Sequence, residues 1–220
     1  MPTKLFLQPH HGDIAWSCSG LIAKNKDDTL VVSLFPPRSK NYWMKLKGIT
    51  YRSKKREDMQ FEKLFGIKFI FEKFPSAFMR GRSVDNLFDK KLTGEEEQLV
   101  QEIRNYITDL ITKEGIKEIY CPMAQRNQID HLIIKQAVFG LIASNVKIYY
   151  YEDFPNFLPE STKGKRFTSL EAEKVDISDV VEEKIQAILI YESLITGYYK
   201  SKETLIEMIR KTPFETYWKD

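Results

Sequence analysis

The chain has 220 residues, of which 42% are hydrophobic and 30% charged, and its formal net charge is +3. This composition is that of a globular protein with a sizeable core, and the charge is too small to indicate nucleic-acid binding. No apolar run approaches the roughly 20 residues that span a bilayer, and the N-terminus lacks a secretory layout. Because two cysteines cannot form a disulfide framework, we expect a cytoplasmic protein that binds neither nucleic acid nor membranes.

Hydrophobic runs and amphipathic segments alternate along most of the chain. Short runs rich in β-branched and aromatic residues predict strands at 4–8, 29–35, 67–74, 116–122 and 146–153. Segments with helical spacing predict helices at about 13–24, 51–66, 93–115 and 130–144. Thr93 and Glu96 have the spacing of a capping box, and Gly66 and Gly115 stand where helices end on glycine.

The last quarter of the chain has a different pattern. Residues 165–177 predict one or two edge strands, 179–199 a long helix and 201–211 a short last helix. The strand–helix alternation before them predicts right-handed βαβ units on a parallel sheet. We therefore expect an α/β protein with a Rossmann-like, open, mainly parallel sheet flanked by helices. The expected single domain spans 1–220, with its C-terminal part, from about 160, packed on the sheet.

All three histidines of the chain lie in loops that follow predicted strands. "PHHGD" contains His10, His11 and Asp13, and "PMAQRNQIDH" contains Asp130 and His131. In an open parallel sheet, ligands bind beyond the carboxyl ends of the strands. Two imidazoles and one carboxylate suit zinc or a similar divalent ion, and three protein ligands leave one position open, as in catalytic zinc sites. The sequence therefore predicts a catalytic metal site at this edge.

An ordered set of four motifs along the chain resembles those of the PIG-L/LmbE-like deacetylases. These are metal-dependent enzymes that remove N-acyl groups from amino sugars and related glycosides. The family's "PH-x-DD" motif corresponds to "PHHGD", and its "H-x-D-H" motif to "QIDH". An "ED…LG" segment matches Glu57, Asp58 and Gly66, and a "YED-x-P" segment matches Tyr151 to Pro155. The resemblance covers nearly the whole chain and implies the family's Rossmann-like fold.

The resemblance also assigns roles to individual residues. It implies that His10, Asp13 and His131 bind a divalent metal, with zinc favoured, which lowers the pKa of a bound water toward about 7. Asp130 corresponds to an aspartate that orients neighbouring groups. Arg80 falls where the family places a substrate-side arginine.

Two positions depart from the family pattern. Gly12 stands where the family has the aspartate that acts as general base, and Gln128 where it has a histidine that assists the leaving amine or the oxyanion. Each such role is worth about 10²–10⁴ in rate. We expect His11 or Asp130 to substitute as base and Gln128 to donate a hydrogen bond. If these groups were simply lost, Gly12→Asp with Gln128→His should restore deacetylation.

Three further features are open to two interpretations each. Glu152 and Asp153 either line the substrate pocket or cap the end of a strand. The run from Arg38 to Arg56 has eight Lys/Arg residues and no acid, and is either a solvated loop or a cationic rim that attracts an anionic small-molecule substrate. Its aromatic residues, such as Trp43, either cover the substrate or contact another copy in a homo-oligomer.

The metal site and the resemblance together imply a zinc-dependent hydrolase that removes an N-acyl group from an amino-sugar-like or nucleotide-linked small molecule. One alternative is a repurposed enzyme that uses the metal as a Lewis acid in non-deacetylase biosynthetic chemistry. Another is a catalytically impaired homologue that only binds the metal. Metal analysis separates the last alternative from the enzymes, and a panel of N-acetylated sugars separates the first two.

Overall fold

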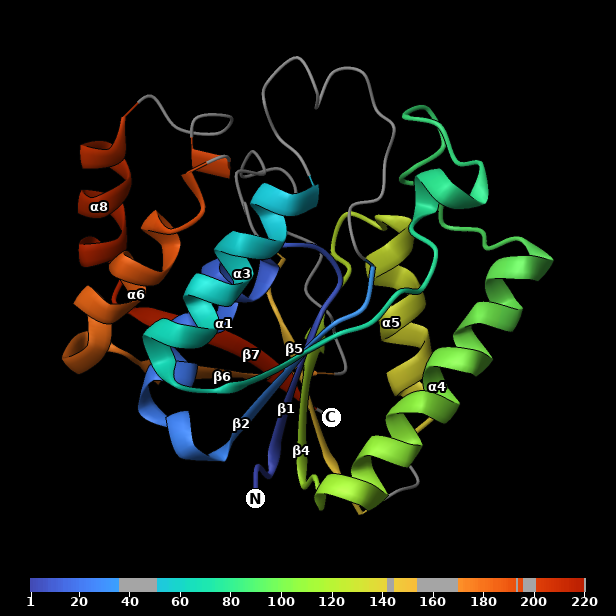
Figure 1. Ribbon diagram of the computed structural model, residues 1–220, viewed down its shortest axis with the longest axis horizontal. Helices are drawn as coiled ribbons and strands as arrows, with labels where there is room; N and C mark the ends of the chain where they lie inside the picture. Colours follow the sequence, from blue (N-terminus) through green and yellow to red (C-terminus); the bar gives the residue numbers. More distant parts are fainter. Residues whose placement is uncertain (36–50, 142–144, 154–169, 193, 196–200, 220) are drawn as a thin grey trace.

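The computed structural model describes residues 1–35, 51–141, 145–153, 170–192, 194–195 and 201–219. Within this part, the strands form one seven-stranded sheet in the order β3-β2-β1-β4-β5-β7-β6 (Figure 1). The strands are β1 (Lys4–Gln8), β2 (Thr29–Ser33), β3 (Lys68–Phe71), β4 (Glu118–Pro122), β5 (Lys147–Tyr151), β6 (Glu171–Asp176) and β7 (Phe214–Lys219). Strands β1 to β5 pair in parallel, whereas β7 is antiparallel to both β5 and β6.

Helices connect the strands and cover both faces of the sheet (Figure 1). The described α-helices are α1 (Asp13–Lys24), α3 (Tyr51–Phe65), α4 (Gly94–Glu114), α5 (Ile129–Phe139), α6 (Val181–Leu189) and α8 (Lys202–Lys211). Short 3₁₀ turns are η1 (Lys26–Asp28), η2 (Ala77–Arg80) and η4 (Ser178–Val180). No helix of the described residues is long and apolar enough to cross a membrane.

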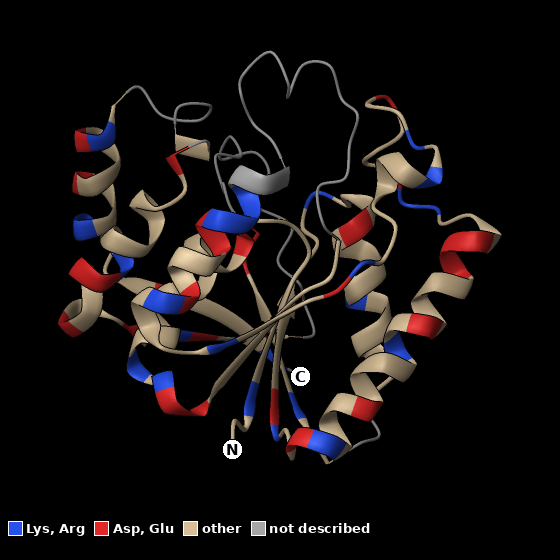
Figure 2. Ribbon diagram, viewed as in Figure 1, with Lys and Arg blue, Asp and Glu red and all other residues tan. Residues whose placement is uncertain are grey.

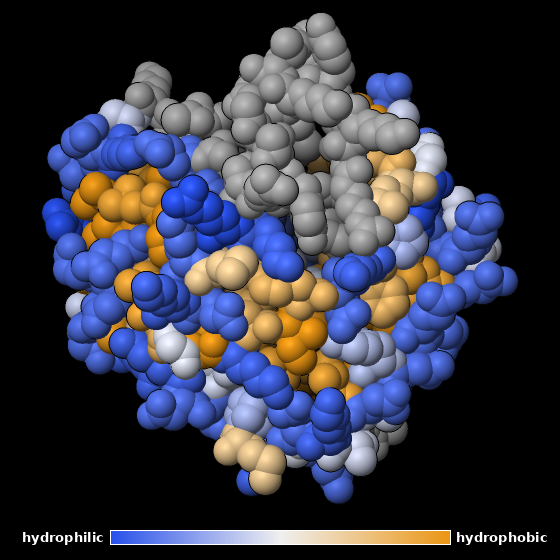
Figure 3. All heavy atoms as spheres, in the orientation of Figure 1, coloured by the Kyte–Doolittle hydropathy of each residue, from blue (hydrophilic) through white to orange (hydrophobic). Residues whose placement is uncertain are grey.

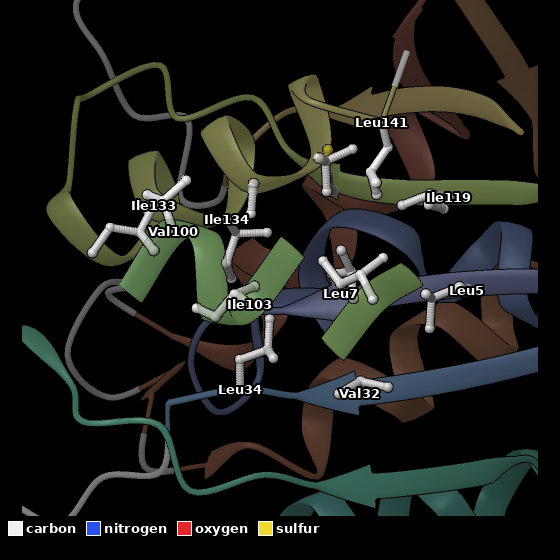
Figure 4. Packing of buried hydrophobic residues seen from close by; sticks show 14 of the residues in the cluster. Leu5, Leu7, Val32, Leu34, Val100, Ile103, Ile119, Ile133, Ile134 and Leu141 are labelled. Atoms are coloured by element: carbon white, nitrogen blue, oxygen red, sulfur yellow. The ribbon is translucent and has the colours of Figure 1, made fainter. Parts of the chain in front are cut away.

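The central strand β1 is buried on both faces because helices cover each of them. Leu5 and Leu7 point toward α4 and α5, where they pack with residues such as Ile103 and Ile133 (Figure 4). Phe6, between them, points to the opposite face and packs with α1, α3 and α6. This two-sided burial explains why the strand is a continuous apolar run rather than an alternating one.

The predicted α/β fold with a mainly parallel sheet is confirmed. The five predicted parallel strands and the four helices between them are present, with ends that differ by a few residues. Thr93 and Glu96 form both hydrogen bonds of the capping box on α4. Gly66 and Gly115 have φ values of 67° and 71°, the left-handed conformation expected where a helix ends on glycine.

One prediction for the C-terminal part was wrong, and one strand there was not predicted. The helix predicted over 179–199 is not continuous, because α6 ends at Leu189 and Tyr191 turns into the core, where its hydroxyl donates to Asp58. The strand β7 was not predicted, although "FETYWK" alternates buried and more exposed residues. It inserts between β5 and β6, a pairing partner that local sequence does not specify.

Candidate metal centre

The topology brings three potential metal ligands to one edge of the sheet. His10 follows β1, Asp13 is the first residue of α1, and His131 lies in the first turn of α5, which follows β4. Strands β1 and β4 are parallel neighbours, so their carboxyl ends meet at the same edge. Residues far apart in the sequence therefore become neighbours at the place where open parallel sheets bind ligands.

The spacing of the three ligand atoms fits a divalent metal. His131 Nε2 lies 3.3 Å from His10 Nδ1 and 3.5 Å from Asp13 Oδ2, and Asp13 Oδ2 lies 3.7 Å from His10 Nδ1. A tetrahedral zinc with ligands at about 2.0–2.2 Å separates them by about 3.3–3.6 Å. Among the described residues, this trio is the group whose ligand atoms converge tightly enough to hold an ion.

A carboxylate lies behind each histidine. Asp130 Oδ2 is 2.8 Å from His10 Nε2, and Asp153 Oδ1 is 2.7 Å from His131 Nδ1. Each carboxylate accepts the proton of the outer ring nitrogen and leaves a lone pair on the inner nitrogen, which orients the imidazole as a metal ligand. This arrangement is typical of metal centres.

The charges of the centre favour a bound cation. Burial opposes the protonation of His131, but the carboxylates of Asp153 and Asp13 outweigh it and raise the pKa of His131 to about 9. Burial also raises the pKa of Asp13, against the opposing effect of the two histidines. The trio thus lies in surroundings rich in negative charge.

Asp130 is held by several donors, which fits the predicted orienting role more closely than that of a base. It accepts hydrogen bonds from Ala77 N at 3.0 Å and from Arg80 Nη2 at 2.8 Å. Burial raises the pKa of Asp130, but His10, Arg80 and the Ala77 N–H outweigh burial and hold that pKa below its usual value. The Arg80 side chain is buried between Asp130 and Glu96, so in this conformation it supports Asp130 instead of reaching toward a substrate.

Asp153 has a similar supporting position. Its second oxygen, Oδ2, accepts from Gln125 N at 2.7 Å, so both oxygens are engaged inside the protein. Its neighbour Glu152 accepts from Trp218 Nε1 at 3.4 Å. In this structure Asp153 thus positions His131, and its contact with substrate stays a prediction. Pro155, in the matching motif, lies outside the described residues.

His11 is turned into the protein. It is buried, its Nε2 lies 2.7 Å from Glu57 Oε2, and its Nδ1 lies 3.1 Å from Asp58 Oδ2, outside good hydrogen-bond angles. Burial opposes its protonation, but Asp58 and Glu57 outweigh burial and raise the pKa of His11. Both ring nitrogens thus face carboxylates, so action as the substitute base would require the ring to rotate.

The position of the missing base is filled. Gly12 has a φ of 86°, and a Cβ atom added there would lie 2.7 Å from Leu194 Cδ1 and 3.0 Å from Tyr191 Cδ1. The backbone conformation favours glycine, and any Cβ here would require the Leu194 and Tyr191 side chains to shift. This geometry argues against the expected restoration of activity by Gly12→Asp.

At the other altered position, Gln128 Oε1 accepts a hydrogen bond from His131 N at 3.0 Å and caps α5.

Two residues that the sequence did not single out lie at the centre. Tyr191, from a helical pattern, covers Gly12 and packs against the His11 ring at a centroid distance of 4.9 Å. Lys54 belongs to the basic run but is buried in the structure. Residues 36–50 of that run lie outside the described part, so its predicted role as a cationic rim stays a prediction.

No protein-family model matches the chain. In sequence it is 24% identical over 206 residues to the 2'-N-acetylparomamine deacetylase of Streptomyces fradiae. The matched region covers 86% of this chain and 72% of that protein. In structure it is similar to the zinc-inhibited form of teicoplanin deacetylase Orf2, with a TM-score of 0.76, 18% identity, and coverage of 98% of this chain and 96% of that chain.

Two other solved structures share the fold. The N,N'-diacetylchitobiose deacetylase of Pyrococcus horikoshii has a TM-score of 0.63 and 16% identity, over 97% of this chain and 82% of that chain. GalB, the 4-carboxy-2-hydroxymuconate hydratase of Pseudomonas putida KT2440, has a TM-score of 0.56 and 17% identity, over 96% of this chain and 84% of that chain. The resemblance to PIG-L/LmbE-like deacetylases is confirmed at the level of the fold.

Proposed function

We propose that this chain is a divergent PIG-L/LmbE-like enzyme, a metal-dependent hydrolase that removes an N-acyl group from an amino-sugar-like or nucleotide-linked small molecule. The observation that carries the proposal is the trio His10, Asp13 and His131, with a carboxylate behind each histidine. The acetylated amino sugars in the names of two similar deacetylases support the substrate class.

The chain's own residues hold and orient the centre. His10, Asp13 and His131 would bind a divalent ion, and their nitrogen and oxygen donors favour zinc. Once bound, such an ion supplies Lewis acidity that activates water and polarises the acyl carbonyl. Asp130 and Asp153 fix the tautomers of the two histidines.

The reaction is expected to be slow compared with that of a relative that has the usual base. Gly12 cannot accept a proton, and Tyr191 and Leu194 occupy the space beside it. Gln128 uses its oxygen to cap α5 and retains an amide N–H₂ group that can only donate. Loss of a general base typically lowers the rate about 10²–10⁴-fold.

The test is an acetate-release assay on protein that has been stripped of metal and reloaded with one equivalent of zinc. The panel contains N-acetylated amino sugars, their oligosaccharides and sugar nucleotides. Excess zinc is avoided because a similar deacetylase is known in a zinc-inhibited form. We expect acetate release by the reloaded protein and none by Asp13→Ala or His131→Ala. Glu97→Gln, which alters an exposed carboxylate on α4, is the control and should retain activity.

The second candidate is non-deacetylase chemistry on the same metal. Two observations favour it: the space of the usual base is filled, and a hydratase is among the proteins with this fold. Silence across the whole panel by protein that binds one zinc per chain would reject the deacetylase and leave this candidate and the catalytically impaired homologue. Failure to bind any divalent metal would reject all three, because each of them holds the ion in the trio.

A further inference from the structure

Lys54 is a buried cation with no partner in the described structure. It lies on α3, and only 8% of its surface is exposed. Among the residues that the structure describes, no hydrogen bond or ion pair engages its ammonium group. The next residue, Lys55, instead lies over the Phe71 ring at 5.0 Å. Although Lys54 belongs to the basic run, its side chain is thus largely buried in the protein.

The topology places Lys54 at the edge of the sheet that holds the metal centre. The helix α3 connects the parallel strands β2 and β3, so it begins near the carboxyl ends of the strands (Figure 1). Lys54 lies in the first turn of α3, and Figure 2 shows Lys and Arg residues at the upper end of this helix. Its ammonium interacts electrostatically with Asp13, a ligand of the trio, as well as with Glu57 and Asp58.

Neutralising the neighbouring carboxylates does not account for Lys54. Glu57 and Asp58 already face the two nitrogens of His11, and Asp58 also accepts from Tyr191 Oη at 2.9 Å and from Gln8 Nε2 at 3.3 Å. The side chain is largely buried, but Nζ is not among the fully buried atoms of the described residues that lack a hydrogen-bond partner, so the ammonium group retains access to solvent at this edge. Burial lowers the pKa of Lys54 against the opposing effect of the carboxylates. A substrate oxygen would supply the missing partner.

We propose that the Lys54 ammonium is a catalytic group that binds the acyl oxygen of the substrate as negative charge develops on it. The inference rests on the proposed function. When water adds to the amide carbon, the new C–O bond forms and the carbonyl oxygen gains the electron pair of its π bond. Lys54 stabilises that oxygen without transferring a proton. The C–N bond then breaks, and the amine leaves with a proton that originates from the water. Lys54 thereby supplies a positive charge at this oxygen, which the neutral amide of Gln128 cannot.

The kinetic test compares Lys54→Met with zinc-loaded wild type. Methionine retains the buried aliphatic stem and removes the charge. We expect kcat to fall about 10²–10³-fold, as for the loss of one oxyanion donor, with KM changed much less. Lys54→Arg should recover part of kcat, and Lys55→Met, the matched control, should leave it unchanged. Equal kcat in Lys54→Met and wild type would overturn the proposal. So would a loss of kcat that only accompanies loss of zinc or of the folded circular-dichroism spectrum.

A binding test keeps this inference separate from the proposed function. Acetate presents a negatively charged oxygen on an acyl carbon and can be titrated into the zinc-loaded protein by calorimetry whether or not the protein hydrolyses anything. We expect Lys54→Met to bind acetate at least tenfold more weakly than wild type and Lys55→Met to bind it equally. Equal affinity in Lys54→Met, or no acetate binding by wild type, would overturn the role of Lys54. Silence in the acetate-release panel together with this affinity difference would reject the deacetylase alone.

Discussion

At the scale of single residues, the centre has an inner set of ligands and an outer set of carboxylates. His10, Asp13 and His131 converge on one point, but their ring orientation is set by Asp130 and Asp153. A histidine without such a partner can rotate and change tautomer, which weakens its bond to a metal. The outer carboxylates therefore matter for metal affinity although neither belongs to the converging trio.

Asp153→Asn tests this dependence. The substitution preserves the shape of the side chain and removes the charge that accepts the His131 proton, so we expect zinc affinity to fall about 10–100-fold. Competition with a chromophoric chelator measures the dissociation constant. Glu152→Gln, the adjacent and chemically equivalent change, should leave that constant unchanged. An unaltered affinity in Asp153→Asn would show that His131 holds its orientation without the carboxylate.

Gly12 illustrates a second residue-scale constraint, which is steric. We predict that Gly12→Ala lowers the free energy of unfolding more than Gly81→Ala, by about 1–3 kcal/mol. The two glycines have nearly the same φ, 86° and 87°, but a Cβ at Gly81 meets no atom within 4 Å, whereas one at Gly12 meets Leu194 and Tyr191. The comparison therefore isolates the contact from the backbone strain. Urea denaturation of both variants measures it, and equal losses would mean that Leu194 simply moves aside.

At the scale of elements, the start of α4 is joined to the segment that supports Asp130. Glu96 closes the capping box with Thr93 and also accepts from Arg80 and Arg82. Burial opposes the ionisation of Glu96, but Arg82, the Thr93 N–H and Arg80 outweigh it and lower its pKa to about 2. Through Arg80, this helix end is connected to the carboxylate behind His10.

The low pKa of Glu96 predicts how stability depends on pH. Because the folded state lowers this pKa from its ordinary value of 4.5 to about 2, ionised Glu96 stabilises the fold above pH 4.5 by up to ~3 kcal/mol. That contribution is lost as the pH falls from 4.5 toward 2. The difference in free energy of unfolding between wild type and Glu96→Gln should therefore be large at pH 6.5 and shrink below pH 4.5, as measured by urea denaturation. The exposed neighbour variant Glu97→Gln should show a small, constant difference.

At the scale of the whole molecule, the C-terminal strand ties the sheet to the helical layer beside the centre. Glu215 on β7 is buried and accepts from Gly20 N and Leu21 N, both at 2.9 Å. It also pairs with Lys184 of α6 and accepts from Tyr217. Thus one carboxylate joins β7, α1 and α6. Figure 3, in the same orientation as Figure 1, shows hydrophilic residues interspersed with smaller hydrophobic patches on this face of the molecule.

Glu215→Ala should destabilise the fold by about 3–5 kcal/mol, because it leaves Lys184 buried without its partner. In a double-mutant cycle, Glu215→Ala together with Lys184→Met should cost less than the sum of the two single changes. Thermal or urea unfolding of the four proteins gives the coupling free energy. Additive losses would indicate that Glu215 acts mainly through the α1 backbone and not through the ion pair.

How much the sequence predicted depends on the range of the interactions involved. The parallel strands, the helices between them and the capping box at Thr93 were predicted correctly because hydrophobic spacing and helix capping are local. The convergence of His10, Asp13 and His131 was also predictable, since each follows or begins an element at one edge of a parallel sheet. The motifs that contain these residues and the topology of the sheet thus predict the same site.

What the sequence could not predict involves contacts between distant segments. The insertion of β7 between β5 and β6 and the end of α6 before Tyr191 depend on which partners the chain meets after it folds. The same holds for the contacts around Gly12, the inward turn of His11 and the burial of Lys54, which has no ion pair among the described residues. The sequence by itself determined the fold and the three candidate metal ligands, because local patterns specify elements and their ends. Only the tertiary structure decided which side chains surround these candidate ligands, because packing and burial arise between elements that the chain brings together.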